Sequence, residues 1–504
     1  GGLRPRGSQL AAPPLDAGRL ASRLPAPVSF PPPHATMPLE PATKRPRVDE
    51  DAAARTEKAK VHLASRGPVG ATDTVGPILL KRGTRTERIY AGRREETYVL
   101  GAACSEVFSG PRLAKVLRPA VELQNRSLER LALGEACEPL SIHTSAGLPA
   151  PLGAFVEAVE AHLPWAADCS GWFMNLQLEG TTAVWAGVEA LMHLQQLAPD
   201  GARRNLVAVA EKSYHGPKTT GLGQPSQPRW PGAPRTQGQL SYPLPSPTGT
   251  AEKDSQEFLR RFDAFLDEHA ASIGVILFEP QWGSTYAARP WPKALLQEAI
   301  RRSHARGILV LCDEIMCGLG RHGQGTLFLS KAWGLEPDAV TFGKSVSAGP
   351  FPMSGAVVRR GGEALGAANS KVVQSHTYAG SSSLALLTAR EVLDELPKWF
   401  EHAKRMGEVV KEVLGPCSDG QFLQVNGLGL MWGGLFTASD EKQRSRCLAL
   451  LREACSEEGV WPYFVPAGGF MLTPPMDIEE PELREGLQRL VRSLRRVQQK
   501  LATA

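Results

Sequence analysis

The sequence lacks several patterns that would assign the protein to a class at once. No stretch approaches the roughly 20 consecutive apolar residues that a membrane-spanning helix needs, and no histidine cluster has the spacing of a metal site. The eight cysteines form no CxxC pair. Scattered cysteines in a chain of 504 residues are typical of free thiols in a reducing compartment. We therefore expect a soluble, cytoplasmic protein without a bound metal.

An excess of one charge is also missing. The 57 basic and 52 acidic residues leave a formal net charge of +5, which is small for this length and gives little support to nucleic-acid binding. The basic run at 44–47 (KRPR) is too short to change that expectation. Hydrophobic residues make up 42% and charged residues 22% of the chain, which is the balance of a globular protein. Its length of 504 residues predicts two or three domains.

Residues 1–60 differ in composition from the rest of the chain. They are rich in proline, alanine and arginine and show no apolar periodicity, so we expect this segment to be disordered. The sequence starts with glycine, and Met37 is a candidate for the start of translation. Only one acidic residue, Asp16, precedes Met37, which keeps organelle targeting open as the alternative to a cytoplasmic location.

From about residue 75 onward, apolar runs alternate with amphipathic helical stretches such as 292–304. Four runs are apolar throughout, as in strands that are buried on both faces: 206–210 (LVAVA), 273–278 (IGVILF), 308–312 (ILVLC) and 339–342 (AVTF). This repetition predicts an α/β fold in which helices flank a mostly parallel sheet. The proline-rich stretch 222–250 interrupts the pattern and predicts a long loop that serves a site or an interface.

The last hundred or so residues change character and predict a second, smaller domain. Helical patterns at 398–414, 439–457 and 479–501 surround a glycine-rich strand region at 420–436 and two short strands within 460–473. We expect a large domain over 111–390 and a smaller C-terminal α+β domain over 391–504. Residues 61–110 are expected to contribute to the smaller domain.

Polar residues follow the predicted strands at the points where the strands end. Asp313 follows 308–312, Lys344 follows 339–342, Glu279 follows 273–278, and Tyr214 comes shortly after 206–210. Because the carboxyl ends of parallel strands meet at one edge of a sheet, we expect these side chains to lie close together.

This set of residues suits pyridoxal phosphate. The cofactor needs a lysine for a Schiff base and a carboxylate that keeps its pyridine nitrogen protonated, and Lys344 and Asp313 supply both. Tyr214 is expected to stack on the ring. The backbone amides at Gly180 and Thr181, where a helix is expected to begin, offer a place for the phosphate.

These motifs together resemble the class III aminotransferases. The resemblance rests on DEIMCGLGRHG (313–323), Pro-Asp at 337–338 and Gly-Lys at 343–344, and continues through EGTTA (179–183), SYHG (213–216), FEPQWG (278–283) and HTYAGSSS (376–383). It covers about 90–500 and is most specific from 171 to 383. It implies the fold-type I architecture of pyridoxal-phosphate enzymes, with a large and a small domain.

The resemblance also implies roles for the residues around the cofactor. Lys344 would form the Schiff base and then move protons during transamination, while Asp313 would pair with the pyridine nitrogen. Ile315 would pack against the ring face opposite Tyr214.

The remaining roles concern the phosphate, the substrate and a second subunit. By the resemblance, Gly180 and Thr181 would hold the phosphate, and Glu279 would lie beside the substrate. Thr377 would reach the phosphate from the neighbouring subunit, so the enzyme is expected to be a homodimer with shared active sites.

Departures from the family pattern limit the functional prediction. Met316 stands where many members have a glutamine, Glu179 where the family usually has serine, and Met471 where many members have a substrate-binding arginine. With Asn426 also replacing a frequent arginine, 2-oxoglutarate as acceptor is in doubt. We expect transamination between an amine or amino acid and an oxo-acid or aldehyde. The alternatives are a racemase, decarboxylase, mutase or lyase that uses the same cofactor, and a catalytically silent dimeric scaffold.

Overall fold

The computed structural model describes most of the chain from residue 78 onward. The described residues are 78–82, 85–90, 93–101, 107–142, 146–165, 171–197, 203–211, 213–216, 222–223, 239–245, 252–359, 377–438, 440–465 and 467–503. Residues 1–60, for which the sequence predicts disorder, lie outside this set. Among the described residues, no helix is both long enough and apolar enough to cross a membrane.

A seven-stranded sheet with the order β4-β12-β11-β10-β9-β5-β8 forms the centre of the structure. Its strands are β4 (Trp172–Gln177), β5 (Leu206–Ala210), β8 (Gln239–Tyr242), β9 (Ile273–Phe278), β10 (Leu309–Cys312), β11 (Ala339–Phe342) and β12 (Ser354–Arg359). β12 runs antiparallel to its neighbours β11 and β4, whereas β8, β5, β9, β10 and β11 pair in parallel. The predicted mostly parallel sheet is confirmed, and its four predicted strands are β5, β9, β10 and β11.

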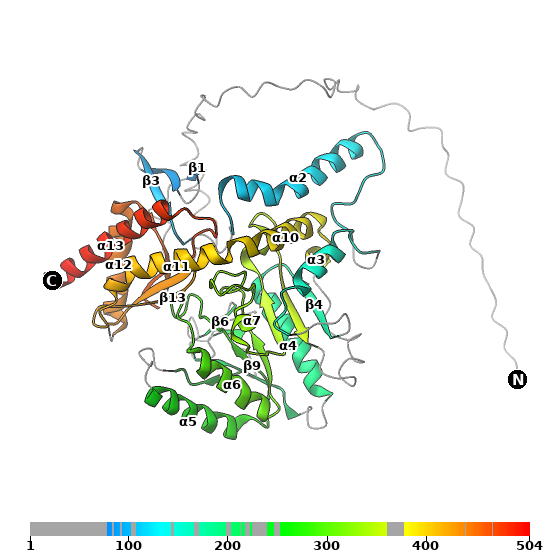
Figure 1. The fold of residues 1–504 in the computed structure, drawn as a ribbon. Coiled ribbons are helices and arrows are strands. Elements are labelled where there is room, and N and C mark those ends of the chain that lie inside the picture. The colour runs from blue at the N-terminus through cyan, green and yellow to red at the C-terminus, as the bar shows by residue number, and fades with distance from the viewer. Residues whose placement is uncertain are drawn as a thin grey trace, which may run out of the picture. The chain divides into compact units, whose positions relative to one another are not determined.

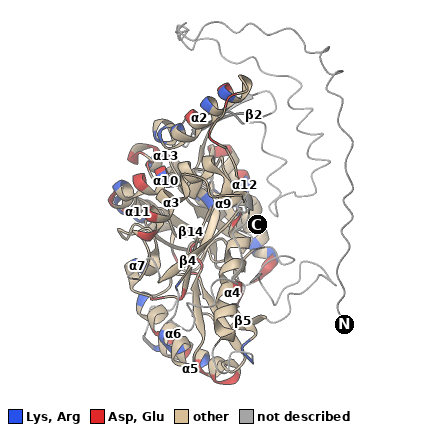
Figure 2. Ribbon diagram, turned by 90° about the vertical axis from the view of Figure 1, so that its right-hand side faces the viewer, with Lys and Arg blue, Asp and Glu red and all other residues tan. Residues whose placement is uncertain are grey.

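Both faces of this sheet are buried, which explains why its strands are apolar throughout. On one face, Val275 and Leu277 of β9 belong to a cluster with Leu191 of α4 (Gly180–Gln196). On the other face, Ile276 and Phe278 belong to a cluster with α5 (Glu252–His269) and α6 (Lys293–Ala305), the predicted helix 292–304. Successive strand residues point to opposite faces, so a strand covered on both sides needs apolar residues throughout. Charged residues gather on outer helices such as α5 and α6 (Figure 2).

Three further helices cover the end of the sheet that carries β4 and β12. α10 (Ser383–Glu395) packs against both α2 (Gly110–Ala132) and α3 (Leu152–Glu160), and Figure 1 shows α2 and α10 side by side. Their apolar residues join those of β11 and β12 in the largest core cluster of the described chain, which continues into the C-terminal helices.

The C-terminal part forms a separate four-stranded sheet in the order β13-β14-β17-β16. The helices and strands of the whole C-terminal part are α11 (Phe400–Leu414), β13 (Leu423–Leu428), β14 (Met431–Phe436), α12 (Glu441–Glu458), β15 (Val460–Trp461), β16 (Tyr463–Val465), β17 (Gly469–Leu472) and α13 (Glu480–Ala502). The three predicted helices are therefore present, but the stretch 460–473 holds three short strands rather than two. The difference arises because Pro462 separates β15 from β16, and each piece pairs with a different sheet.

Strands from the N-terminal part of the chain lie beside this region. β1 (Ile78–Arg82), β2 (Arg85–Tyr90) and β3 (Arg93–Val99) form a second four-stranded sheet with β15. β15 pairs in parallel with β3, and Figure 1 shows β1 and β3 next to α13. Segments from opposite ends of the chain therefore share one sheet.

The prediction of an uninterrupted loop over 222–250 is wrong in two places. Leu222–Gly223 form β7, which pairs antiparallel with β6 (Tyr214–His215). Residues 239–242 form β8, which pairs in parallel with β5 at the edge of the central sheet. Tyr242 anchors β8, because its ring is fully buried and its hydroxyl donates a hydrogen bond to the Leu277 carbonyl at 2.7 Å. A strand of four residues among prolines is too short to show a period, and tertiary contacts decide it.

Close packing between the C-terminal sheet and the loop after β9 makes one glycine essential. A Cβ atom added at Gly433 would lie 2.4 Å from the Ala287 carbonyl oxygen and 2.7 Å from the Phe470 carbonyl oxygen, whereas one at Gly415 would meet no atom within 4 Å. We expect Gly433→Ala to destabilise the protein by about 1–3 kcal/mol and Gly415→Ala to change stability by less than about 1 kcal/mol. Chemical denaturation of the two variants tests this, and equal midpoints would contradict it.

Candidate active site

The structure brings the predicted residues to one edge of the central sheet. Asp313 directly follows β10, Lys344 follows β11 after one glycine, and Glu279 directly follows β9. Since these three strands are adjacent and parallel, their carboxyl ends lie side by side. Tyr214 reaches the same edge in β6 (Tyr214–His215), a short strand after β5.

Asp313 is buried, and both oxygens of its carboxylate make hydrogen bonds. Oδ2 lies 2.7 Å from Nδ1 of His215, while Oδ1 accepts hydrogen bonds from the backbone amide of Ile315 at 3.1 Å and the hydroxyl of Thr341 at 3.2 Å. Burial lowers the pKa of His215, but the hydrogen bond and the charge of Asp313 outweigh it, so that the net shift is upward. His215 therefore donates Nδ1–H to Asp313 and holds this carboxylate in one orientation.

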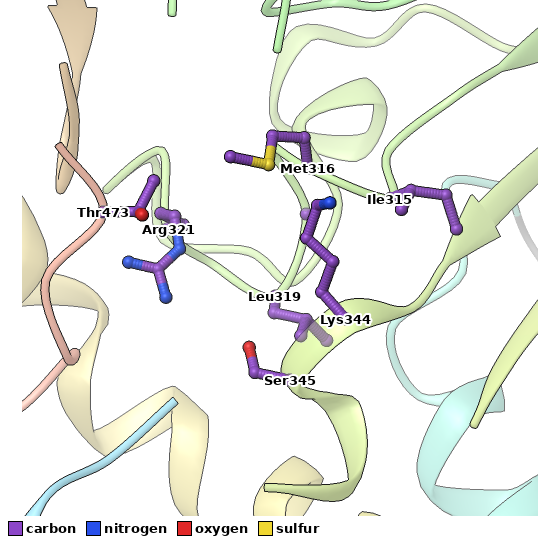
Figure 3. Close-up of a pocket in the computed structure, with 8 residues that line it drawn as sticks. Ile315, Met316, Leu319, Arg321, Lys344, Ser345 and Thr473 are labelled. Atoms are coloured by element: carbon purple, nitrogen blue, oxygen red, sulfur yellow. The ribbon is translucent and has the colours of Figure 1, made fainter. Parts of the chain in front are cut away.

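Lys344 opens a single 3-10 turn, η3 (Lys344–Ser347), and adopts an unusual backbone conformation. Its φ is 52°, in the left-handed region that residues other than glycine rarely occupy and that recurs at functional sites. The side chain lines a pocket whose walls include Ile315, Met316 and Thr473. Figure 3 shows its amine directed toward Met316, with Ile315 on one side and Thr473 on the other.

Glycines bring the walls of this site together. A Cβ at Gly180 would lie 2.7 Å from Cγ2 of Ile315, and one at Gly343 would lie 3.0 Å from Cδ1 of the same side chain. Ile315 is therefore packed between the start of α4 and the end of β11. Gly216 has φ 124°, and a Cβ there would lie 2.1 Å from Cγ2 of Thr181.

The N-terminus of α4 is open at this edge. Glu179 is its N-cap residue, and its side chain makes no capping hydrogen bond within the described structure. The first backbone amides of a helix lack partners inside the helix and attract anions. The side chain of Glu179 is exposed, which lets its charge stay in water.

Tyr214 is a predicted site residue whose side chain solvent can reach. Tyr214 is 47% exposed although it stands at the site. Thr377 begins α9 (Thr377–Ser381), but its side chain lies outside the described part of the structure, so its predicted contact with a phosphate stays a prediction. The neighbouring Tyr378 is 68% exposed.

The two glutamates of the site are in different situations. Glu314 caps α7 (Leu329–Trp333), because its carboxylate accepts hydrogen bonds from the amides of Leu329 at 2.6 Å and Ser330 at 2.8 Å. Glu279 accepts a hydrogen bond from the amide of Gly283 at 3.0 Å, and the amide of Tyr214 also stabilises its charge, but its Oε1 has no hydrogen bond among the described residues. Burial raises the pKa of each carboxyl group to about 7. Glu314 therefore has a structural role, whereas Glu279 keeps a carboxylate oxygen for another use.

Met316 and Met471, the departures from the family pattern, lie in one apolar cluster. Its buried members are Ala287, Ala288, Cys317, Met431, Val465 and Met471, and Met316 packs against them. Arg289 is buried over the Trp282 ring and donates a hydrogen bond to the Pro245 carbonyl at 2.9 Å. The position of the expected clamp is therefore apolar.

Neither of the two side chains that orient Asp313 was predicted from the sequence. His215 belongs to the quoted SYHG motif but received no role, because only the fold brings it to Asp313. Thr341 is the only polar residue within the run 339–342. A polar side chain in an otherwise apolar buried strand needs a hydrogen-bond partner, and this signal could have identified it.

Comparisons with known proteins place the chain in one family. The sequence profile of the family "Aminotransferase class-III" matches residues 141–494. The chain is 28% identical to 4-aminobutyrate aminotransferase of Escherichia coli over 359 residues, which cover 66% of this chain and 79% of that protein. It is also 28% identical to 2-aminoadipate transaminase of Pseudomonas putida over 360 residues, or 68% of this chain and 81% of that protein.

Solved structures show the same fold. An omega-transaminase from Thermomicrobium roseum matches with a TM-score of 0.72 and 20% identity, covering 88% of this chain and 98% of that one. A PMP-bound aminotransferase from Vibrio fluvialis matches with a TM-score of 0.72 and 18% identity, covering 89% and 98%. The structural matches establish the fold alone, but the family profile covers well over half of the sequence. The chain therefore belongs to the class III aminotransferases, which are transaminases that use pyridoxal phosphate.

Proposed function

We propose that Lys344 and Asp313 are the catalytic residues of this transaminase. The enzyme moves an amino group between an amine or amino acid and an oxo-acid or aldehyde acceptor. The observation that carries the assignment is the buried Asp313 carboxylate, which His215 and Thr341 hold at the edge of the sheet where Lys344 lines a pocket. A carboxylate and an amine at that edge are the two groups that the cofactor requires.

The shape of the site supports the fit of the cofactor. Gly180 and Gly343 draw Ile315 against the backbone, and Gly216 does the same for Thr181. An apolar side chain held in this way offers a flat contact for one face of a ring, and the exposed Tyr214 is available for the other face. The amides at the start of α4 and the hydroxyl of Thr181 would hold the phosphate.

When bound, pyridoxal phosphate supplies a conjugated ring that accepts the electron pair released at a substrate carbon. The carboxylate of Asp313 would hold a proton on the ring nitrogen through a charge-assisted hydrogen bond. His215 and Thr341 orient that carboxylate, so they act as positioning residues. Lys344 would carry the cofactor, then remove a proton from the amine-bearing carbon of the substrate and return it as the acid.

We also infer that the active sites are shared in a homodimer. Large apolar side chains are exposed along α2, among them Val121, Leu128 and Leu131, and surfaces of this kind favour an interface. Tyr378 is exposed beside Thr377, at the start of α9. By this inference Thr377 reaches the phosphate of the neighbouring subunit.

The domain boundaries and the location stay predictions. Pairing of β15 with β3 supports the assignment of part of 61–110 to the smaller domain with 391–504, and the continuous sheet over 172–359 supports the large domain 111–390. The expected cytoplasmic location rests on composition alone, with organelle targeting as the alternative.

The first prediction from the proposed function concerns the covalent bond between Lys344 and the cofactor. We expect purified protein supplied with pyridoxal phosphate to absorb near ~420 nm, and we expect borohydride to abolish that band by reducing the lysine linkage. Lys344→Ala should lack the band, whereas Lys331→Ala, a control at another lysine, should keep it. If the wild-type protein shows no such band with excess cofactor, the scaffold alternative replaces the catalytic assignment.

The second prediction concerns the support of Asp313. We expect Asp313→Asn to lower kcat by about 100-fold or more, because an amide cannot hold the ring nitrogen protonated. His215→Leu should lower kcat about 10-fold to 100-fold with a smaller change in KM, since it removes a hydrogen bond to a charged group. His215→Asn should restore most of the rate, because the amide can donate in place of Nδ1. Equal losses in both His215 variants would indicate a structural role only.

The third prediction tests the shared site. Lys344→Ala and Thr377→Ala homodimers should each be impaired. After unfolding and joint refolding at equal amounts, we expect about a quarter of wild-type activity, because half of the random dimers are mixed and each mixed dimer has one intact site. Activity no higher than the average of the two separately refolded variants would place Thr377 in the site of its own subunit.

A further inference from the structure

The hydroxyl of Thr473 is buried and has no hydrogen-bond partner among the described residues. Thr473 directly follows β17 and is 1% exposed. A hydroxyl that leaves water without a new hydrogen bond destabilises the folded state, whereas valine has nearly the same shape without that cost. The stability of the protein without substrate therefore does not account for a threonine at this position.

Contacts on both sides of Thr473 fix the place of this hydroxyl. The backbone amide of Thr473 donates a hydrogen bond to the Leu100 carbonyl at 2.8 Å. The next carbonyl along the chain, that of Pro474, accepts a hydrogen bond from Arg321 at 2.7 Å. Two prolines follow Thr473 and restrict the backbone there, and a β-branched side chain has few rotamers. The hydroxyl is therefore held in place before any ligand binds.

Thr473 lines the same pocket as Lys344. Figure 3 shows Thr473 and Arg321 on the side of Lys344 that lies away from Ile315. The residues that line the described pocket include two basic side chains, Lys344 and Arg321, and no acidic one. A ligand group with an oxygen that accepts a hydrogen bond therefore suits this wall, whereas a second ammonium group would meet a like charge.

We propose that Thr473 is a specificity-determining residue, whose hydroxyl donates a hydrogen bond to an oxygen of the substrate. The proposal rests on the proposed function, in which the amine of the substrate reacts at Lys344. It gives amines with a hydroxyl or carboxylate oxygen an advantage over alkyl amines of the same length. These two kinds of oxygen share the ability to accept the hydrogen bond, and the experiment distinguishes them.

Three amines test this selection: butylamine, 3-amino-1-propanol and 3-aminopropanoate. The last two carry their oxygen on the third carbon, where butylamine carries a methyl group. With the holoenzyme, the rate constant for loss of the absorption band of the lysine-bound cofactor reports the first half-reaction for each amine. The ratio of each oxygen-bearing amine to butylamine is taken within one variant. Since the intrinsic reactivity of the amines is the same for every variant, a change in the ratio isolates the contact with the protein.

Substitutions assign this contact to one hydroxyl. In Thr473→Val we expect the ratio for 3-amino-1-propanol to fall about 3-fold to 10-fold if a neutral oxygen is bound, or the ratio for 3-aminopropanoate to fall about 10-fold or more if a carboxylate is bound. Thr473→Ser keeps a hydroxyl and should retain most of each ratio. Thr388→Val is the matched control. The Thr388 hydroxyl is also buried without a partner among the described residues, but Thr388 does not line the pocket, so both ratios should stay at wild-type values.

The melting temperature of the holoenzyme without substrate gives a second readout. Thr473→Val should melt no lower than the wild-type protein, because it removes a hydroxyl without a partner and keeps the shape of the side chain. A hydroxyl with a structural role would instead lower the melting temperature when it is removed. If Thr473→Val keeps both wild-type ratios while the band is still lost, the assignment of Thr473 is wrong and the proposed function stands.

A third comparison does not require turnover. In Lys344→Ala protein with added cofactor, at least one oxygen-bearing amine should raise the melting temperature more than butylamine does. This difference should vanish in Lys344→Ala/Thr473→Val. If no amine discharges the band of the wild-type protein, the proposed function fails, and this comparison still decides whether Thr473 binds an oxygen of the ligand.

Discussion

The buried carboxylate of Asp313 is the group on which the active site depends. A carboxylate at the end of a central strand is tolerated only when hydrogen bonds replace the water it has lost. His215, Thr341 and the amide of Ile315 supply those bonds from three different parts of the chain. The Ile315 amide is local, but Thr341 reaches Asp313 because β11 lies beside β10, and His215 comes from a segment after β5. The packing of the strands and the chemistry of the site are therefore linked.

The same edge of the sheet uses three carboxylates in three ways. Glu314 accepts hydrogen bonds from the amides at the start of α7 and thereby stabilises the fold. Asp313 is held by His215 and Thr341 and, in the proposed function, would pair with the ring nitrogen of the cofactor. Glu279 retains an oxygen without a partner, and burial raises its pKa to about 7. Their neighbours, rather than their residue type, separate these roles.

The wall of the pocket opposite the central sheet comes from the C-terminal part of the chain. The side chain of Gln281 donates to the carbonyls of Ala288 at 2.7 Å and Met431 at 2.9 Å and thereby ties the loop after β9 to β14. Arg321 ties the loop after β10 to the Pro474 carbonyl. Through these contacts Met471, which stands where many family members have an arginine, joins Met316 of the pocket in one apolar cluster.

Local pattern in the sequence was sufficient for the parallel sheet, because strands buried on both faces must be apolar throughout, and for the edge at which Asp313 and Lys344 meet. The resemblance of the motifs to a known family then predicted pyridoxal phosphate as the cofactor. Tertiary structure alone decided that His215, 98 residues before Asp313, is its hydrogen-bond partner, that 239–242 is an edge strand, and that Glu279 keeps a buried oxygen without a hydrogen bond among the described residues. Contacts between distant segments depend on how whole helices and strands pack, and the local sequence around one residue does not determine that packing.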